Sequence, residues 1–293
     1  MIPDKYILNS VAHESCFIKL EQSVLSKGVA SKHPVAIIVG AQPGAGKTNL
    51  IKFLRQRLRE RHIVINGDDY RRMHPLFYSL SFEDDKKIAE YTDPSVRDWT
   101  SRLLSLAIDK SFNIILEITL RQHEPILATV ERLSSRNYQI GLGVLAVKYE
   151  FSTLGIHERY ETQKEALGYG RWTTQEAHDA SYNNMPQTIS FLENSRFLSA
   201  ISVYDRNCSK IYGNHCDSCG NWTNQRISAY QAINDFRNRP LSREETELLF
   251  LSFDGLIAKK KQRDAPKDEI EIVQRMYDRF RGKHQPSPPS FRP

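Results

Sequence analysis

The sequence predicts an α/β fold in which helices cover both faces of a parallel central sheet. Short, wholly apolar runs alternate with segments of helical periodicity through the first half of the chain, the pattern of successive strand–helix–strand units. Wholly apolar runs of this length are typical of strands buried on both faces. A glycine-rich segment, Gly40–Thr48, lies between the first apolar run and the first helical segment.

Strands and helices alternate in the first half of the chain. Leu50, Ile51 and Leu54 recur at helical spacing among basic residues, directly after the glycine-rich segment. We expect strands over Val35–Val39, His62–Asn66, Asn113–Leu116 and Gln139–Val147. We expect the intervening helices over Thr48–Leu58, Pro94–Lys110 and Pro125–Ser134.

The second half is predicted to be mostly helical and polar. Ser242-x-x-Glu245 is a capping box, which marks a helix start. Helices are expected over Thr153–Leu167, Thr174–Asn194, Gln225–Arg237, Ser242–Leu251 and Lys267–Arg281, and short strands over Ala200–Tyr204 and Lys210–Tyr212. The last ten residues include four prolines, so we expect an extended or disordered tail.

Composition favours an ordinary globular protein with anionic partners. Hydrophobic residues make up 40% and charged residues 26% of the 293 residues, and the net charge is +6. The compact basic run Lys259–Arg263 is typical of a solvated helix face rather than of a nucleic-acid site. Neither a membrane span nor a secretory signal is apparent, so we expect a cytoplasmic protein.

Three cysteines and a histidine lie close together in the second half: Cys208, His215, Cys216 and Cys219. Cys216 and Cys219 have the C-x2-C spacing of half a zinc site. A second such pair is missing, and structural zinc needs four ligands. We expect free thiols in a surface loop, with zinc binding as the alternative.

The glycine-rich segment Gly40–Thr48 has the composition of a phosphate-binding loop (P-loop). Gly44, Ala45 and Gly46 are expected to direct backbone N–H groups at phosphate oxygens. Lys47 is expected to reach the β- and γ-phosphates of ATP, and the Thr48 hydroxyl to coordinate Mg²⁺. The usual pattern places its first glycine at position 41, where this chain has Ala41.

Polar groups follow two more of the predicted strands, at the edge of the sheet where the P-loop is expected. Asp68 follows the second strand, and Glu117 and Thr119 follow the third. A carboxylate beside the γ-phosphate can accept the proton of an attacking hydroxyl, so Asp68 is a candidate general base. Asp69 is the expected helix N-cap. The N-K-x-D segment that reads guanine is not found.

Several segments together resemble the zeta toxin family: GAQPGAGKT, INGDDYRRMHPLF, ILEITLRQ, HERYETQ and QEAHD, in this order from about Pro34 to Tyr212. The resemblance implies a three-layer P-loop kinase with a helical lid. It also implies transfer of a phosphoryl group from ATP to the 3′-hydroxyl of UDP-N-acetylglucosamine or a related UDP-aminosugar, which starves peptidoglycan synthesis. A small antitoxin neutralises such toxins, so one is the implied protein partner.

The resemblance also assigns roles to individual residues. Asp68 matches the base that activates the sugar hydroxyl. Glu117 and Thr119 match the pair that contacts the sugar, and Arg121 matches the arginine just behind them. Arg159 and Arg171 resemble lid arginines that neutralise charge on the transferring phosphoryl group, and Arg206 resembles a residue near the nucleotide base.

The resemblance sets the expected domain organisation. Residues 1–33 are a helical segment with one helix around Ser15–Leu25, and residues 34–282 are the kinase domain with its lid and a helical C-terminal extension. Residues 283–293 are the proline-rich tail. The first segment is too short for a fused inhibitory domain, so any antitoxin has to be a separate chain.

The chain departs from the family pattern at several positions. Glycine is frequent in the family where Ala41, Ile118 and Leu120 stand, and aspartate where Asn66 stands. Ile118 and Leu120 are expected to narrow or reshape the substrate pocket. The cysteine-containing segment is an insertion.

Two other functions remain open from the sequence. One is a P-loop kinase of another hydroxyl, such as the ribose of NAD or a polynucleotide end. A polynucleotide substrate requires a basic channel with stacking aromatic residues. Tyr169 and Trp172 beside Arg171 are the only hint of one and suit packing of the lid better. The other is a low-turnover ATP-binding regulatory module, for which Lys47 is needed and Asp68 is dispensable.

Overall fold

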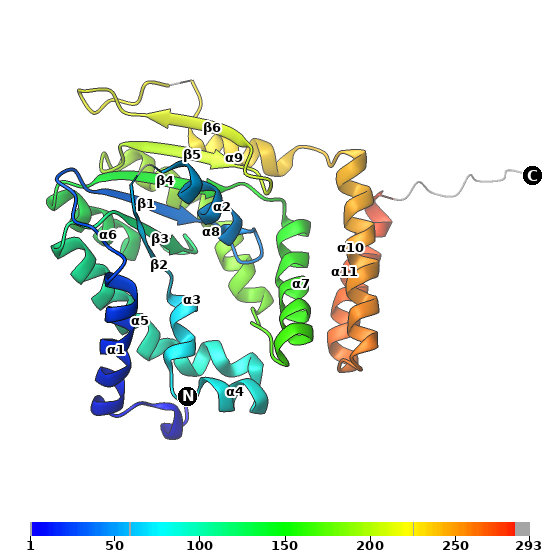
Figure 1. Ribbon diagram of the computed structural model, residues 1–293. Coiled ribbons are helices and arrows are strands. Elements are labelled where there is room, and N and C mark those ends of the chain that lie inside the picture. Colours follow the sequence, from blue (N-terminus) through cyan, green and yellow to red (C-terminus); the bar gives the residue numbers. More distant parts are fainter. Residues whose placement is uncertain (1, 59, 225, 285–293) are drawn as a thin grey trace, which may run out of the picture.

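The described residues (2–58, 60–224 and 226–284 of a computed structural model) contain one six-stranded sheet of order β2-β3-β1-β4-β5-β6 (Figure 1). β1 to β5 are parallel, and β6 is antiparallel to β5 at the edge. The strands are β1 (Val35–Gly40), β2 (Ile63–Ile65), β3 (Ile114–Ile118), β4 (Gln139–Leu145), β5 (Ala200–Tyr204) and β6 (Lys210–His215). The predicted α/β fold with parallel strands is confirmed for β1 to β5.

The direction of β6 follows from its short connection. Only residues 205–209 join it to β5, and Asp205 holds this turn by accepting hydrogen bonds from the backbone N–H groups of Asn207 and Ser209. A parallel neighbour requires a long crossover, so a short turn returns the chain antiparallel. The sequence predicts a short strand here without its direction, and the turn makes it the antiparallel edge strand of the sheet.

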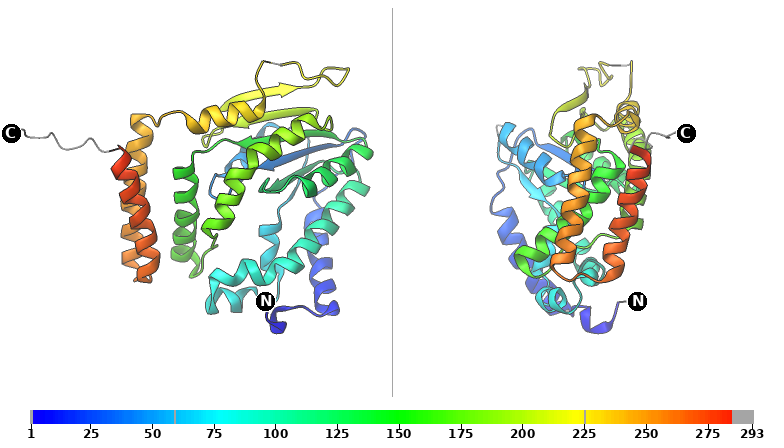
Figure 2. Two further views of the ribbon diagram at one scale, coloured as in Figure 1. Left: turned by 180° about the vertical axis from the view of Figure 1, so that it is seen from behind. Right: turned by 90° about the vertical axis from the view of Figure 1, so that its right-hand side faces the viewer.

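Helices cover both faces of the sheet. α2 lies on one face, and α8 and α9 lie on the other (Figures 1 and 2). The α-helices are α1 (Ser10–Leu25), α2 (Lys47–Arg57), α3 (Gly67–Tyr70), α4 (Phe77–Glu83), α5 (Ile88–Asp109), α6 (Glu124–Ser135), α7 (Tyr149–Leu167), α8 (Gln175–Asn194), α9 (Ala229–Asn238), α10 (Arg243–Gln262) and α11 (Lys267–His284). Short 3-10 helices are η1 (Asp4–Tyr6), η2 (Arg71–Met73) and η3 (Asp85–Lys87). Within the described part of the chain, no helix has the length and hydropathy that crossing a membrane requires.

α5 and α10 extend furthest beyond their predicted bounds. α5 begins at Ile88 rather than at Pro94, and the turn before the proline receives hydrogen bonds from Arg71, to the Ala89 carbonyl and the Thr92 hydroxyl. α10 continues to Gln262 instead of ending at Leu251. Contacts made by distant residues stabilise both extensions, and sequence periodicity does not show such contacts.

The N-terminal helix α1 belongs to the main core. Phe17 and Leu20 are buried in it, and the Arg102 guanidinium of α5 lies 3.6 Å from the centre of the Phe17 ring. The same guanidinium donates two hydrogen bonds of 2.8 Å to the carboxylate of Glu14. At the other end of the chain, α11 includes residues 283 and 284, and the rest of the predicted tail, 285–293, lies outside the described residues.

α10 and α11 form a helical pair beside α7, as the views in Figures 1 and 2 show. Leu154 of α7 packs with Leu249 and Phe253 of α10 and with Val273 of α11 in a separate apolar cluster. The helical C-terminal extension expected from the sequence is therefore packed on the helix that carries Arg159.

A buried network of charges joins this pair to the rest of the molecule. Lys260 is fully buried and donates to Glu161 of α7 at 2.5 Å and to Glu269 of α11 at 3.1 Å. Arg263 bonds the same two carboxylates, and Lys86 of η3 pairs with Glu269 at 2.7 Å. The prediction that Lys259–Arg263 is a solvated face is thus wrong for Lys260, because its partners come from two other helices.

Candidate active site

The P-loop joins β1 to α2 as predicted. Gly44 and Gly46 have φ of 76° and 101°, in the left-handed region that favours glycine, and Gly46 caps α2. A Cβ at Gly44 would overlap the Ser152 carbonyl oxygen of α7, so the glycine also allows the lid helix to approach the loop. Lys47 is the first residue of α2, and Thr48, which follows it, is exposed. This backbone fits a polyphosphate at a helix N-terminus.

The first glycine of the loop stands at position 40 rather than at position 41, and a residue just after β3 gives the reason. Leu120 has φ of 54°, unusual for a leucine, and is almost completely buried. Its side chain fills the space where a Cβ of Gly40 would lie. Glycine at position 40 therefore makes room for Leu120, while Ala41 is buried. The expectation that Leu120 faces the substrate pocket is wrong, because its side chain points into the core.

We expect Gly40→Ala to lower the free energy of unfolding by about 1–3 kcal/mol, because the new methyl group overlaps Leu120 in a packed core. The double variant Gly40→Ala/Leu120→Gly should lose less than the sum of the two single variants, as measured by urea denaturation. Gly143→Ala in β4 is the matched control, because its Cβ would meet Leu54 at an ordinary 3.6 Å. Additive losses would contradict this account of the glycine.

Lys47 lies against its own loop. Its Nζ donates hydrogen bonds to the carbonyls of Ala41 at 3.0 Å and Gln42 at 3.3 Å. Burial lowers the pKa of Lys47 to about 8; Glu117 opposes this shift and Arg171 adds to it. The ammonium group is therefore close enough to both side chains to interact with them electrostatically.

Asp68 lies on α3, directly after β2. Asn66 caps this short helix by accepting a hydrogen bond from the Asp68 N–H at 3.0 Å, so the N-cap is Asn66 and not Asp69 as predicted. The Asp68 carboxylate accepts a hydrogen bond from Arg71 at 3.1 Å and pairs with Arg171. The structure thus brings together the candidate base and one of the two candidate lid arginines.

The two arginines determine the charge state of Asp68. Burial alone would raise the pKa of its carboxyl, but Arg171 and Arg71 outweigh burial and hold that pKa below its usual value. Arg71 is itself fixed, because it also donates to Asp93 of α5 at 3.0 Å. Sequence reasoning missed Arg71, although it lies in the same INGDDYRRMHPLF segment as Asp68.

Glu117 is the penultimate residue of β3, beside the P-loop. It pairs in register with Val39 of β1, and burial raises the pKa of its carboxyl while Lys47 opposes this. Thr119 and Arg121 follow in an exposed segment, where Asn184 of α8 donates to the Arg121 carbonyl at 3.3 Å. Glu117 is therefore close enough to Lys47 to interact with it electrostatically. Thr119 and Arg121, which follow in the chain, lie on the surface of the protein.

The lid consists of α7 and the loop that leads to α8. Arg159 on α7 donates to the Thr173 hydroxyl at 2.7 Å, and its buried Nε has no partner among the described residues. Burial lowers the pKa of Arg159 to about 9, and Arg171 adds to this effect. The Arg171 N–H donates to the Gln163 side chain at 2.7 Å, which fixes the lid loop onto α7. Both lid arginines therefore belong to the electrostatic environment of Asp68.

A cavity of about 320 Å³ lies under the lid loop beside Asp68. Three arginines and three aspartates contribute its charged lining, and several aromatic rings line it as well. The lining residues include Asp68, Asp69, Arg71, Arg72, Phe77, Asp85, Tyr169, Arg171 and Trp172. A cavity with cations and flat rings at its wall suits an anionic ligand that contains a ring.

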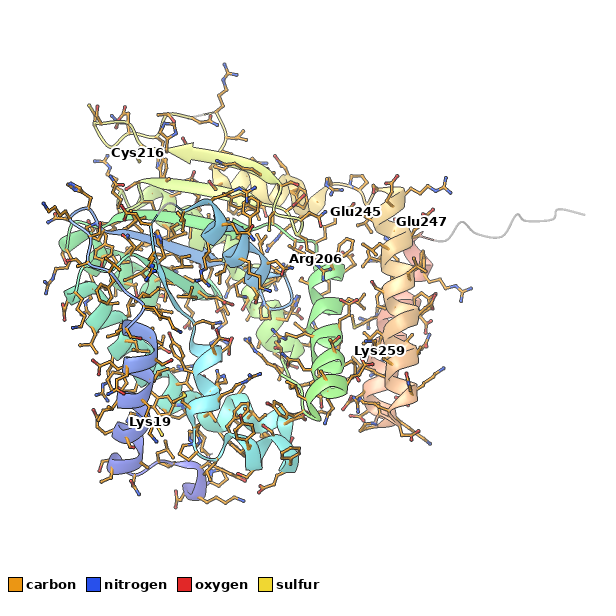
Figure 3. The ribbon with its side chains drawn as sticks, viewed as in Figure 1. Lys19, Arg206, Cys216, Glu245, Glu247 and Lys259 are labelled. Carbon is orange, nitrogen blue, oxygen red and sulfur yellow. The ribbon has the colours of Figure 1, made fainter. Side chains whose placement is uncertain are left out.

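A second cavity of about 390 Å³ lies on the other side of the P-loop, beside α2 and the end of β5. Arg206 lines it, pairs with Glu158 of α7 at 3.7 Å and lies near the Phe151 ring. Its side chain is also adjacent to Gly46 of the P-loop, and Figure 3 shows it between β5 and α7. This position is next to the phosphate site and not in it.

Cys216 lies away from this site, directly after β6 (Figure 3), whereas Cys208 lies in the turn before β6, close to Arg206. Cys208, Cys216 and Cys219 are free thiols, and Cys219 is exposed. Among the described residues, no three His, Cys, Asp or Glu side chains form a group that could hold a metal ion.

The fold and the loop define a class of protein. The glycine-rich loop joins the first strand of a largely parallel sheet to the following helix, and a lysine and a hydroxyl stand at its end. This arrangement is typical of a P-loop protein of the kinase type. A family model described as Zeta toxin matches residues 21–217, more than half of the chain. The chain belongs to the zeta toxin family, and the resemblance found in its sequence is confirmed.

Curated relatives agree with this assignment. Toxin zeta of Streptococcus agalactiae is 31% identical over 66% of this chain and 69% of the relative. Toxin zeta of Enterococcus hirae is 27% identical over 87% of this chain and 86% of the relative. Toxin PezT of Streptococcus pneumoniae is 30% identical over 62% of this chain and 73% of the relative. The alignment with the Enterococcus protein includes much more of the chain than the family model does.

Solved structures show the same fold. A chain from the PezAT chromosomal toxin–antitoxin system of Streptococcus pneumoniae superposes with a TM-score of 0.73 at 24% identity, over 87% of this chain and 98% of that chain. A chain from a crystal structure of AvrRxo1-ORF1:-ORF2 with ATP superposes with a TM-score of 0.56 at 12% identity, over 92% of this chain and 84% of that chain. At these identities the likeness concerns the fold alone.

Proposed function

We propose that this protein transfers the γ-phosphoryl group of ATP to a sugar hydroxyl, and that the acceptor is the 3′-hydroxyl of UDP-N-acetylglucosamine or a related UDP-aminosugar. One observation carries the proposal. Asp68 lines a cavity together with three arginines, is paired with one of them, Arg171 of the lid, and lies within electrostatic reach of Lys47 of the P-loop. A base, a phosphate site and an acceptor cavity thus meet at one sheet edge.

The proposed reaction uses these groups in a simple order. The loop amides from Gly44 to Thr48 hold the phosphates, and Lys47 leaves its own loop carbonyls for the β- and γ-phosphates. The acceptor oxygen forms a bond to the γ-phosphorus as the bond to the β,γ-bridging oxygen breaks, and ADP leaves. Asp68 takes the proton of the acceptor hydroxyl. Mg²⁺, held by the Thr48 hydroxyl, would neutralise charge on the β- and γ-oxygens.

The ion pair between Arg171 and Asp68 fits this order. Without nucleotide, the arginine holds the pKa of Asp68 low, which makes the carboxylate a poor base. A bound γ-phosphate competes with Asp68 for Arg171. When Arg171 moves from Asp68 to the γ-phosphate, the pKa of Asp68 rises, so the carboxylate becomes a better base for the acceptor hydroxyl. Arg159, whose buried Nε lacks a partner in the described structure, is available to the transferring group.

The cavity favours a nucleotide sugar over a polynucleotide end. Arg71, Arg72 and Arg171 suit a diphosphate, and Phe77 and Tyr169 suit a ring. A polynucleotide end would need an extended channel with successive stacking positions. The relatives named toxins support a role as the toxin of a toxin–antitoxin system, with a small separate antitoxin as partner.

The acceptor is tested by the rate of ADP formation with Mg²⁺-ATP alone and after addition of UDP-N-acetylglucosamine, NAD or a 5′-hydroxyl oligonucleotide. We expect stimulation by the UDP-aminosugar only, and none in Lys47→Ala. Stimulation by NAD or by the oligonucleotide instead would overturn the acceptor and keep the kinase. Tight ATP binding without stimulation by any acceptor would overturn the kinase in favour of a regulatory module.

A further inference from the structure

Arg237 of α9 is a buried arginine that contacts the P-loop. It lies beyond the residues 21–217 that match the family model, on the helix packed next to α8 (Figure 2). Only 7% of its surface is exposed. One Nη donates to the Gln42 side-chain oxygen at 2.9 Å, and the other donates to the Tyr182 carbonyl at 2.8 Å. Its remaining contacts are the Tyr182 ring at 4.0 Å and the Met185 sulfur at 3.8 Å.

The partner of Arg237 is a central residue of the loop. Gln42 is fully buried, and its side-chain nitrogen donates to the Val147 carbonyl at 3.1 Å, so its amide is held at both ends. The backbone carbonyl of the same residue accepts from Lys47 Nζ at 3.3 Å and from the Ala45 N–H at 3.4 Å. Arg237 therefore fixes Gln42, whose backbone carbonyl accepts hydrogen bonds from Ala45 and Lys47 of the loop.

The charge of Arg237 has no carboxylate partner among these contacts. Burial lowers its pKa to about 10, so the guanidinium is still protonated at neutral pH, and its Nε has no hydrogen-bond partner in the described structure. An unpaired buried charge is costly unless something compensates it. Lys148 is also buried and donates hydrogen bonds to the backbone carbonyls of Arg237 and Arg239. It therefore adds positive charge to the same region.

We propose that Arg237 is a positioning residue of the nucleotide site: it holds the P-loop through Gln42, and its unpaired positive charge is balanced by the bound polyphosphate. This inference rests on the proposed function only in that a nucleotide binds the loop. Arg237 is not among the residues that line either cavity of the candidate site, so it acts through the loop. A purely structural arginine, which only ties α9 to α8 through Tyr182, would not distinguish one phosphate from three.

The number of phosphates in the ligand provides the test. Dissociation constants for adenosine, AMP, ADP and ATP are measured by calorimetry on the full chain with Mg²⁺. We expect Arg237→Gln to weaken ATP roughly tenfold, the effect of one partly screened charge, and to leave adenosine unchanged. The exposed Arg243, whose side chain pairs with Glu247 at 2.8 Å, gives the control Arg243→Gln, which should bind all four ligands like the wild type.

Gln42→Met keeps the charge and removes the hydrogen bond, which preserves a test if Arg237→Gln does not fold. We expect it to weaken ATP more than adenosine, by a smaller factor than Arg237→Gln. Equal losses for adenosine and ATP, or wild-type ATP binding in both variants, would overturn the inference. Failure of the wild type to bind ATP at all would instead overturn the proposed function.

Discussion

We expect Asp68→Asn to lower the turnover number of phosphoryl transfer roughly a hundred- to ten-thousand-fold, the usual contribution of a positioned general base. The asparagine oxygen can still accept hydrogen bonds from Arg71 and Arg171, so the shape of the site is kept. Its amide cannot take the proton of the acceptor hydroxyl. ATP binding should not weaken, because Asp68 is not part of the P-loop and competes with the γ-phosphate for Arg171.

The matched control is the next residue. Asp69 is exposed and lines the same cavity, but it has no role in the proposed proton transfer, so Asp69→Asn should retain nearly wild-type turnover. Both variants are compared by steady-state rates at saturating acceptor and by ATP dissociation constants. Equal turnover in Asp68→Asn and Asp69→Asn would remove Asp68 from the role of base and favour the regulatory module.

We expect Lys260→Met to lower the free energy of unfolding by about 3–5 kcal/mol, the range for breaking a buried ion pair. Lys260 is fully buried between Glu161 and Glu269, and among the described residues these carboxylates would retain Arg263 and Lys86 as cationic partners. Because the network joins α7 to α10 and α11, the loss should loosen the lid as well as the C-terminal pair.

Lys259 provides the comparison, since it lies one residue away and is half-exposed (Figure 3). It pairs with Glu165 of α7 at 2.9 Å, so Lys259→Met should cost less than about 1 kcal/mol, the usual value of a surface ion pair. Chemical denaturation of the two variants measures the difference directly. Similar losses in both would show that the buried network does not hold the helical pair in place.

The sequence predicted the parts of the fold that depend on local pattern. Val35–Val39 is apolar at every position, so a strand buried on both faces could be recognised without its neighbours. The P-loop was found in the same way, because its backbone requires Gly44 and Gly46 at fixed offsets from Lys47. No direction was predicted for β6, although the short turn before it contains the information.

Features that depend on distant partners could not be predicted. Lys260 looks like one of three solvated lysines until α7 and α11 place Glu161 and Glu269 around it. Leu120 looked like a wall of the substrate pocket, and only its left-handed backbone conformation turns it towards Gly40. Arg237 lies in a polar helix without a motif, and its contact with Gln42 spans 195 positions of the chain. Tertiary packing, not local sequence, decides each of these.

The most direct test of the central claim is identification of the product. Purified protein is incubated with Mg²⁺-ATP and UDP-N-acetylglucosamine, and the sugar nucleotide is isolated for mass spectrometry and for phosphorus–proton correlation by NMR. The account predicts a gain of one phosphoryl group, with the new phosphorus coupled to the proton at the 3′-carbon of the aminosugar, and no product from Asp68→Asn or Lys47→Ala. A sugar nucleotide of unchanged mass, recovered while the enzyme converts ATP to ADP, would contradict it.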